Sequence, residues 1–246
     1  MSQITIPASL DEKVSDAIRF FWNTRSGQIK RQNTVGTHDQ GNRGAVTGGK
    51  QLDGFVALVK EILLLNGVPE ECIFTDSDLE LPGYYRPNKK WDLLVVDNEQ
   101  LIIAIEFKSQ VGPSFGNNFN NRTEEAMGSA LDLWTAYREG VFGETSSPWI
   151  GYLMVLEDCK KSNDPVRTRS PHFPVLQEFN DSSYKERYRI FCSKLLLERQ
   201  YSAACFITTK YDNAVASYDY PETALTFKSF VLSMIGAVIA HFGGDN

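Results

Sequence analysis

The chain has 246 residues, of which 42% are hydrophobic and 23% are charged. This composition excludes global disorder and provides enough apolar material for one large core, so we expect a single domain over residues 1–246. No apolar run follows a basic N-terminal stub, so we expect no signal peptide. The longest apolar stretch, residues 230–240, is about half the roughly 20 residues that a membrane span needs. The four cysteines are far apart and form no C-x-x-C pair. A soluble, cytoplasmic protein with no membrane partner is therefore expected.

The net charge of −6 at first argues against a nucleic-acid partner. The acidity is concentrated, however: residues 51–110 carry five Lys/Arg against eleven Asp/Glu, whereas residues 1–50 carry seven against four. A metal-dependent DNA-cutting enzyme tolerates such a pattern, because carboxylates gather where the metal is held.

The first elements of the chain are helical. Residues 9–25 predict a helix with Ser9 as its N-cap and apolar side chains at helical spacing. The polar, glycine-rich residues 28–50 have little to bury and predict a surface loop. A second helix is predicted over residues 52–65, ending at the stop signal Asn66-Gly67.

The middle of the chain predicts a β-hairpin. Residues 90–96 and 101–107 are rich in Val, Ile and Leu, and the polar residues 97–100 separate them. The remaining patterns predict a helix at 123–139, a strand at 149–156, a helix at 184–200, a strand at 203–209 and a helix at 221–242. Because helices and strands alternate, the fold class is α/β, with a central mixed sheet flanked by helices.

Three side chains of the hairpin carry the chemistry. Glu106 and Lys108 project from one face of their strand, because side chains alternate along it. Folding the hairpin at residues 98–99 brings Asp92 opposite Glu106, give or take one residue of register. Two carboxylates and an ammonium group then meet at the end of an apolar sheet.

These groups suit a Mg²⁺-dependent reaction on a phosphate. Mg²⁺ takes oxygen ligands, which Asp92, Glu106 and the backbone carbonyl of Phe107 provide. The metal would polarise a scissile phosphate and acidify a water, while Lys108 orients or deprotonates that water and stabilises negative charge. On its own, an E-x-K triplet more often marks a salt-bridged strand edge, and that alternative stays open.

The layout Asp92…Glu106-x-Lys108 resembles the P-D…(D/E)-x-K motif of the restriction-endonuclease-like nuclease superfamily, with Trp91 in place of the usual proline. Residues 112–126 and 128–134 are in addition similar to XhoI-type restriction endonucleases, and the similarity covers essentially the whole chain. The resemblance implies a restriction-endonuclease-like fold and catalytic roles for Asp92, Glu106 and Lys108.

For function, the resemblance implies a bacterial, homodimeric type II restriction endonuclease that needs Mg²⁺ and no ATP. Its implied substrate is double-stranded DNA at the palindrome CTCGAG, cut after the first C to leave 5′ overhangs. A cognate methyltransferase would act separately on the same site.

The superfamily also implies a possible further metal ligand, since a glutamate from the helix before the motif sometimes joins the site. Glu61 lies on such a helix; the alternative is a solvated helix-face charge.

Candidates for reading the DNA follow from the chemistry of base recognition, in which Arg or Lys pairs with guanine and Asn or Gln with adenine. Three polar segments have such side chains, each of which is otherwise an ordinary solvated residue. The candidates are Arg31, Asn33, Gln40, Asn42, Arg43 and Lys50 in the first segment, Asn117, Asn118 and Arg122 in the second, and Lys161, Arg167 and Arg169 in the third.

Two other functions stay open. One is a structure-specific DNA repair or junction-resolving nuclease of the same fold. The other is a non-catalytic DNA-binding protein whose E-x-K is a strand salt bridge. The sequence also leaves open whether one or two metal ions act.

Overall fold

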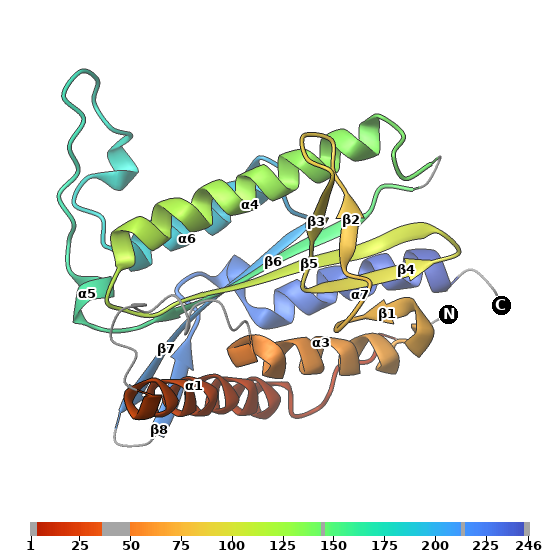
Figure 1. Ribbon diagram of the computed structural model, residues 1–246, viewed down its shortest axis with the longest axis horizontal. Coiled ribbons are helices and arrows are strands. Elements are labelled where there is room, and N and C mark those ends of the chain that lie inside the picture. The colour runs from red at the N-terminus through yellow and green to blue at the C-terminus, as the bar shows by residue number, and fades with distance from the viewer. Residues whose placement is uncertain (1–3, 36–49, 144–145, 213–214, 244–246) are drawn as a thin grey trace.

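A computed structural model describes residues 4–35, 50–143, 146–212 and 215–243, without the side chains of residues 28–35. A mixed six-stranded sheet lies between two layers of helices (Figure 1). The predicted α/β class and the mixed sheet flanked by helices are thus confirmed.

The sheet has the strand order β1-β4-β5-β6-β7-β8. The central strands β5, β6 and β7 are parallel, and the flanking pairs β1–β4, β4–β5 and β7–β8 are antiparallel. The strands are β1 (Ile73–Phe74), β4 (Leu93–Asp97), β5 (Gln100–Gln110), β6 (Trp149–Glu157), β7 (Ala203–Asp212) and β8 (Val215–Asp219). A separate antiparallel pair consists of β2 (Glu80–Pro82) and β3 (Asn88–Lys90).

Helices α1 (Leu10–Val35), α3 (Asp53–Leu65) and α7 (Phe227–Phe242) cover one face of the sheet, and α4 (Phe115–Arg138) and α6 (Tyr184–Leu197) cover the other. Short helices lie between them: η1 (Lys50–Leu52), η2 (Glu70–Cys72), α5 (Lys160–Asn163), η3 (Gln177–Phe179) and η4 (Thr223–Leu225). Among the described residues, no helix has the length and hydropathy to cross a membrane.

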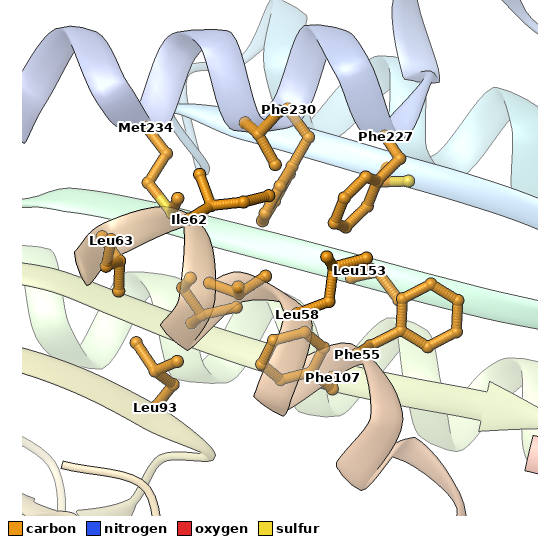
Figure 2. Packing of buried hydrophobic residues seen from close by; sticks show 14 of the residues in the cluster. Phe55, Leu58, Ile62, Leu63, Leu93, Phe107, Leu153, Phe227, Phe230 and Met234 are labelled. Carbon is orange, nitrogen blue, oxygen red and sulfur yellow. The ribbon is translucent and has the colours of Figure 1, made fainter. Parts of the chain in front are cut away.

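The core under α3 and α7 fixes the position of the central strands. Phe55 and Ile62 of α3 and Phe230 of α7 converge with Phe107 of β5 and Leu153 of β6 (Figure 2). Residues 230–240 contribute to this core, which explains why the stretch is apolar without being a membrane span.

The predicted hairpin is confirmed as β4 and β5. Asn98 and Glu99 have φ angles of 46° and 63°, the left-handed conformation that the tightest hairpin turns require. Leu93 pairs with Ile105, and the Asp92 N–H donates to the Ile105 carbonyl at 3.1 Å. Continued by one residue, this register places Asp92 opposite Glu106, as predicted.

The predicted loop at residues 28–50 was wrong in its first part. α1 continues to Val35, ten residues beyond the predicted end. Gln, Lys and Arg are good helix formers even where they have no apolar face to bury, so polarity alone was a poor sign of a loop.

The start of α4 was also placed too late, because the helix begins at Phe115 and not at residue 123. Its first turns are rich in asparagine, which has low helix propensity. Phe115 and Phe119 pack on Tyr184, and their ring centroids lie 5.8 and 6.4 Å from that of Tyr184. These tertiary contacts outweigh the low helix propensity of the asparagines.

Candidate active site

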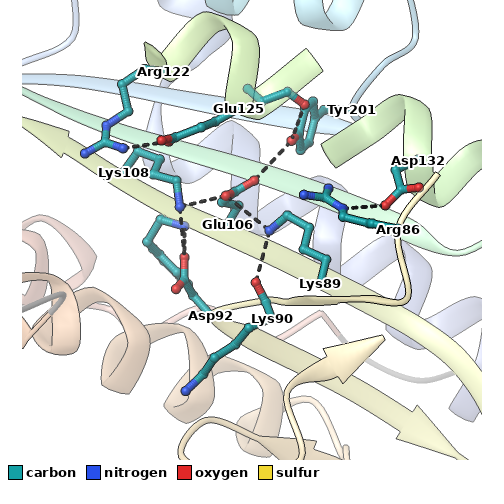
Figure 3. A network of polar contacts seen from close by, with 12 residues as sticks. Arg86, Lys89, Lys90, Asp92, Glu106, Lys108, Arg122, Glu125, Asp132 and Tyr201 are labelled. Atoms are coloured by element: carbon teal, nitrogen blue, oxygen red, sulfur yellow. Dashed lines mark hydrogen bonds and ion pairs between the residues drawn. The ribbon is translucent and has the colours of Figure 1, made fainter. Parts of the chain in front are cut away.

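Asp92, Glu106 and Lys108 meet at one place on the sheet, as the sequence predicted (Figure 3). The Lys108 ammonium lies 2.6 Å from Glu106 Oε1 and 3.9 Å from Asp92 Oδ2. The Phe107 N–H donates to Asp92 Oδ2 at 2.7 Å, which holds that carboxylate beside β5. Glu106 and Lys108 share one face of β5, while Ile105 and Phe107 enter the core on the other.

Glu106 has a second cationic partner that the sequence reasoning missed. Lys89 of β3 donates to Glu106 Oε1 at 3.2 Å, and its ammonium lies 4.3 Å from the centre of the Trp91 ring. The Tyr201 hydroxyl is 3.4 Å from the other carboxylate oxygen, Oε2. The single O–H proton of Tyr201 has a shorter contact, 3.0 Å, with the Ala126 carbonyl. Only 3% of the Glu106 side chain is exposed, so it is a buried carboxylate held chiefly by two ammonium groups.

The environment shifts the pKa values of these groups. Burial would raise the pKa of Glu106, but Lys108 and Lys89 outweigh it and leave the pKa below its ordinary value. Burial would lower the pKa of Lys108, but Glu106 and Asp92 outweigh it and raise the pKa. For Asp92, burial is the stronger effect and raises the pKa, with Lys108 and the Phe107 N–H opposing it. Glu106 is therefore ionised and Lys108 protonated in this arrangement.

A cavity of about 180 Å³ opens beside Asp92 and Lys108. Two buried polar atoms on its lining residues, Gln51 Oε1 and Arg122 Nε, have no hydrogen-bond partner in the described part of the chain. Gln51 is 6% exposed, and its Nε2 donates to Ser109 Oγ at 2.8 Å. Because a buried unsatisfied polar group is costly, two such atoms on lining residues indicate that the wall of the cavity is suited to a polar ligand or an ordered water.

The oxygen donors at this cavity fit Mg²⁺. Asp92, Phe107 and Lys108 line the cavity. Glu106 does not line it, but its Oε1 lies 2.6 Å from the Lys108 ammonium. No cluster of three or more His, Cys, Asp or Glu side chains that could hold a metal occurs among the described residues. A site with two carboxylates agrees with Mg²⁺, which is commonly bound by one or two carboxylates together with substrate phosphates and water.

Glu61 is not brought to this centre. Its carboxylate pairs with Lys13 of α1 at 2.9 Å, and 43% of its side chain is exposed. Asp53, at the start of the same helix, lines a neighbouring cavity of about 540 Å³ together with Asp92 and Asp76. The helix thus presents an acidic side chain towards the centre from its first turn, two turns before Glu61.

The DNA-contact candidates separate into three groups. Asn118 and Arg122 line the cavity at Lys108, and Lys50 lines the neighbouring cavity with Asp53; Asn117 is exposed on the first turn of α4. Lys161, Arg167 and Arg169 are exposed on α5 and the segment after it, which projects beyond the end of α4 (Figure 1).

The candidates near the N-terminus are less well placed. Arg31 and Asn33 belong to α1, but their side chains are not described. Gln40, Asn42 and Arg43 lie outside the described residues.

The signals for the missed residues differ. Lys89 and Lys90 are two consecutive lysines immediately before Trp91-Asp92, so a sequence pattern for them existed. Gln51 and Asp53 follow a polar segment and have no such pattern; only the packing of α3 against β5 brings them near Asp92.

The mixed sheet, the β4–β5 hairpin and the arrangement of Asp92, Glu106 and Lys108 define the restriction-endonuclease-like class of nucleases. Comparison with known proteins gives the family. The family model described as "Restriction endonuclease XhoI" matches residues 31–220.

Three type II restriction enzymes are similar to this chain. BstVI from Geobacillus stearothermophilus is 47% identical over 203 residues, which cover 80% of this chain and 91% of that enzyme. XhoI from Xanthomonas vasicola is 48% identical over 193 residues, covering 78% and 77% of the two chains. AbrI from Azospirillum brasilense is 50% identical over 167 residues, covering 68% and 75%. No solved structure matches the chain.

The chain therefore belongs to the XhoI family of restriction endonucleases. Its enzyme class is that of the type II restriction endonucleases.

Proposed function

We propose that this enzyme hydrolyses phosphodiester bonds of double-stranded DNA at the palindrome CTCGAG, with Mg²⁺, and leaves 5′ overhangs. The observation that carries the proposal is the convergence of Asp92, Glu106 and Lys108 beside a cavity lined by Gln51 and Arg122, each of which has a buried polar atom with no partner among the described residues. The resemblance to XhoI-type enzymes supports the particular recognition sequence.

Each residue of the centre has a role in this proposal. Asp92, Glu106 and the Phe107 carbonyl would hold Mg²⁺, which would stabilise charge on the scissile phosphate and acidify a water. Lys108, protonated between the two carboxylates, donates to the phosphate as negative charge develops on it. The Arg122 Nε–H is a second donor for a phosphate oxygen, and Gln51 Oε1 accepts a hydrogen bond from the attacking water. Asp53 takes the place proposed for Glu61 as an additional acidic group near the metal.

The setting of the reaction follows from the palindromic site. A two-fold symmetric site calls for a homodimer, since protein symmetry then matches DNA symmetry. We propose that the enzyme acts as a homodimer in the bacterial cytoplasm, beside a separate methyltransferase that protects the same site. Of the DNA-contact candidates, Asn118, Arg122 and Lys50 are the best supported, because they line the cavities at Asp92.

The test is digestion of a long, fully sequenced, unmethylated DNA with Mg²⁺ and then with EDTA, with every product end sequenced. Discrete Mg²⁺-dependent fragments ending at CTCGAG are expected, and a parallel preparation of the Lys108→Ala variant controls for contaminating nuclease. Discrete ends at another palindrome would contradict the CTCGAG assignment. Cleavage of branched DNA alone would favour the structure-specific nuclease, and binding without cleavage would favour the non-catalytic DNA-binding protein.

Oligomeric state and protection have their own measurements. Sedimentation of the protein with a CTCGAG duplex should give two chains per duplex, and one chain would contradict the dimer. DNA methylated within CTCGAG should resist digestion; equal cleavage of both DNAs would argue against the paired methyltransferase.

A further inference from the structure

The β2–β3 hairpin stands apart from the main sheet and lies against α4 beside the active site (Figures 1 and 3). Its connecting residues, 83–87, form what we call the hairpin loop. An isolated pair of three-residue strands is only marginally stable by itself, so the hairpin needs contacts outside its own ladder.

Asp132 of α4 supplies these contacts. Its carboxylate accepts the Tyr84 and Tyr85 N–H groups, each at 2.8 Å, and the Arg86 Nε–H at 2.7 Å. Only 5% of the Asp132 side chain is exposed. A Cβ at Gly83 would lie 2.6 Å from Asp132 Oδ2, so the close approach of loop and carboxylate requires glycine there. A buried carboxylate thus fixes the shape of an exposed loop.

The side chains that the hairpin loop presents are suited to a nucleic acid. Tyr84 and Tyr85 are 50% and 66% exposed, with their rings edge to face 4.9 Å apart. The Arg86 side chain is 42% exposed although its Nε is held by Asp132. Rigid aromatic rings and an oriented guanidinium group are the side chains that contact bases, sugars and phosphates with little loss of conformational entropy.

A groove of about 610 Å³ connects the hairpin loop with the active site. Tyr85 and Arg86 of the loop line it together with Glu106, Lys108 and Arg122, and Figure 3 shows Arg86 and Arg122 on opposite sides of Glu106. Its five cationic side chains face four acidic ones, of which Glu106, Glu125 and Asp132 already pair with cations in the groove. The lining of this groove thus joins Lys108, at the candidate active site, to Arg86 of the hairpin loop.

We propose that the hairpin loop is a DNA-recognition element, in which Tyr85 and Arg86 contact the duplex beside the scissile phosphate and Asp132 holds them in position. The inference rests on the proposed function and adds a segment to it that lies outside the three polar segments singled out from the sequence. Asp132 is a positioning residue here, since it acts through the loop and not on the DNA.

The experiment measures binding and cleavage separately for Tyr85→Ala, Arg86→Ala and Asp132→Asn. Binding is measured by fluorescence anisotropy in EDTA, with one labelled duplex containing CTCGAG and a second in which one base pair of the site is changed. Lys228→Ala, which removes an exposed cation from α7 on the other side of the sheet, is the matched control, and Tyr85→Phe keeps the ring. Circular dichroism checks that each variant is folded.

The loop variants should weaken binding to the CTCGAG duplex by about tenfold or more, the size expected for losing one good DNA contact, with a smaller effect on the altered duplex. Tyr85→Phe and Lys228→Ala should bind like the wild type. Asp132→Asn should lose discrimination between the two duplexes. Its rate of cleavage at saturating DNA should fall by a smaller factor than its affinity for the CTCGAG duplex, a combination that general destabilisation does not produce.

Two results would overturn the inference while leaving the proposed function intact. One is a wild type that cuts CTCGAG together with loop variants that bind and cut as Lys228→Ala does. The other is a Tyr85→Ala variant that has become monomeric, which would assign the loop to an interface between two copies of the chain. A wild type that cuts no CTCGAG duplex would instead overturn the proposed function, and the inference with it.

Discussion

At the scale of single residues, the candidate active site is dominated by one buried carboxylate with two lysines. Glu106 holds Lys108 at 2.6 Å and Lys89 at 3.2 Å, and the lysine side chains are only 20% and 12% exposed. Buried ammonium groups are costly without a counter-charge, so each lysine depends on Glu106 more than Glu106 depends on either lysine. This asymmetry separates effects on stability from effects on catalysis.

Both Glu106→Ala and Lys108→Ala should abolish DNA cleavage, by a factor on the order of 10³ or more, because each removes a group that acts on the scissile phosphate or the metal. Both variants should fold. Glu106→Ala should be less stable than Lys108→Ala by about 1–3 kcal/mol, since it removes the carboxylate partner of Lys89 and leaves Lys108 only its longer contact with Asp92. Cleavage assays and urea unfolding measure the two effects; full activity in either variant would refute the catalytic assignment.

Gln51→Leu should reduce the rate of cleavage at saturating DNA by about tenfold, the effect of losing one hydrogen bond to the attacking water. The free energy of unfolding should change little, because leucine loses the hydrogen bond to Ser109 but also removes a buried oxygen that has no partner among the described residues. Ser109→Ala, which removes only the group that holds the Gln51 amide, should give a smaller loss of rate. Wild-type rates in Gln51→Leu would leave Gln51 with a packing role only.

At the scale of elements, α7 and β6 are packed closely enough for a single methyl group to matter. A Cβ at Gly151 would lie 2.6 Å from the Trp149 ring and 2.7 Å from the Phe230 ring. Gly236, on α7, has open space around its Cβ position. The two glycines thus allow packing in this interface to be compared with helix propensity at an exposed position of α7.

Gly151→Ala should destabilise the protein by about 1–3 kcal/mol through overpacking. Gly236→Ala should instead stabilise it by about 0.5–1 kcal/mol, because alanine is the better helix former and meets no neighbour. Thermal or urea unfolding of both variants gives the comparison. Equal stabilities would mean that the Trp149 and Phe230 rings give way at little cost.

The contact between the β2–β3 hairpin and α4 should depend on pH. Burial would raise the pKa of Asp132, but the hydrogen bonds from the Tyr85 N–H and Arg86 outweigh it and leave the folded-state pKa below the ordinary value. Because the unfolded chain has the higher pKa, the stabilisation is complete above about pH 4 and is lost as pH falls through the lower, folded-state pKa.

Asp132→Asn should therefore lose stability relative to the wild type at neutral pH, and the difference should shrink as the pH falls below about 4. Urea unfolding over a pH series measures it, with Lys228→Ala as the control. A difference that stays constant with pH would show that ionisation of Asp132 is not what anchors the hairpin.

At the scale of the whole molecule, two apolar cores share one sheet. Alternate residues of the same strands serve both: Ile105 and Leu153 face α3 and α7, whereas Ala104 and Tyr152 face α4 and α6. Because neither helix layer can lose its packing without exposing the sheet between them, we propose that the chain behaves as a single domain.

Unfolding in urea should accordingly show one transition, with the same midpoint by far-ultraviolet circular dichroism and by tryptophan fluorescence. Trp149 reports on the core under α3 and α7, and Trp91 reports on the core under α4 and α6. Two separate midpoints would contradict the single domain. The oligomeric state must be held fixed during the measurement, because dimer formation shifts apparent stability.

The sequence by itself determined the β4–β5 hairpin, the facing of Asp92 towards Glu106 and the α/β class. These follow from local physics: strand alternation, a two-residue turn and the period of apolar side chains. The Asp92…Glu106-x-Lys108 motif and the resemblance of residues 112–134 to XhoI-type enzymes indicated the restriction endonuclease family, which the comparisons confirm.

Only the tertiary structure decided which other side chains surround that pair. Gln51 and Asp132 are brought to the centre or its rim by packing between segments far apart in the chain, and Glu61 is paired with Lys13 instead. The tertiary structure also decided where α4 begins, because contacts of Phe115 and Phe119 with Tyr184 stabilise its first turns. Such contacts leave no local period in the sequence, because their energy comes from burial against partners that the chain order does not reveal.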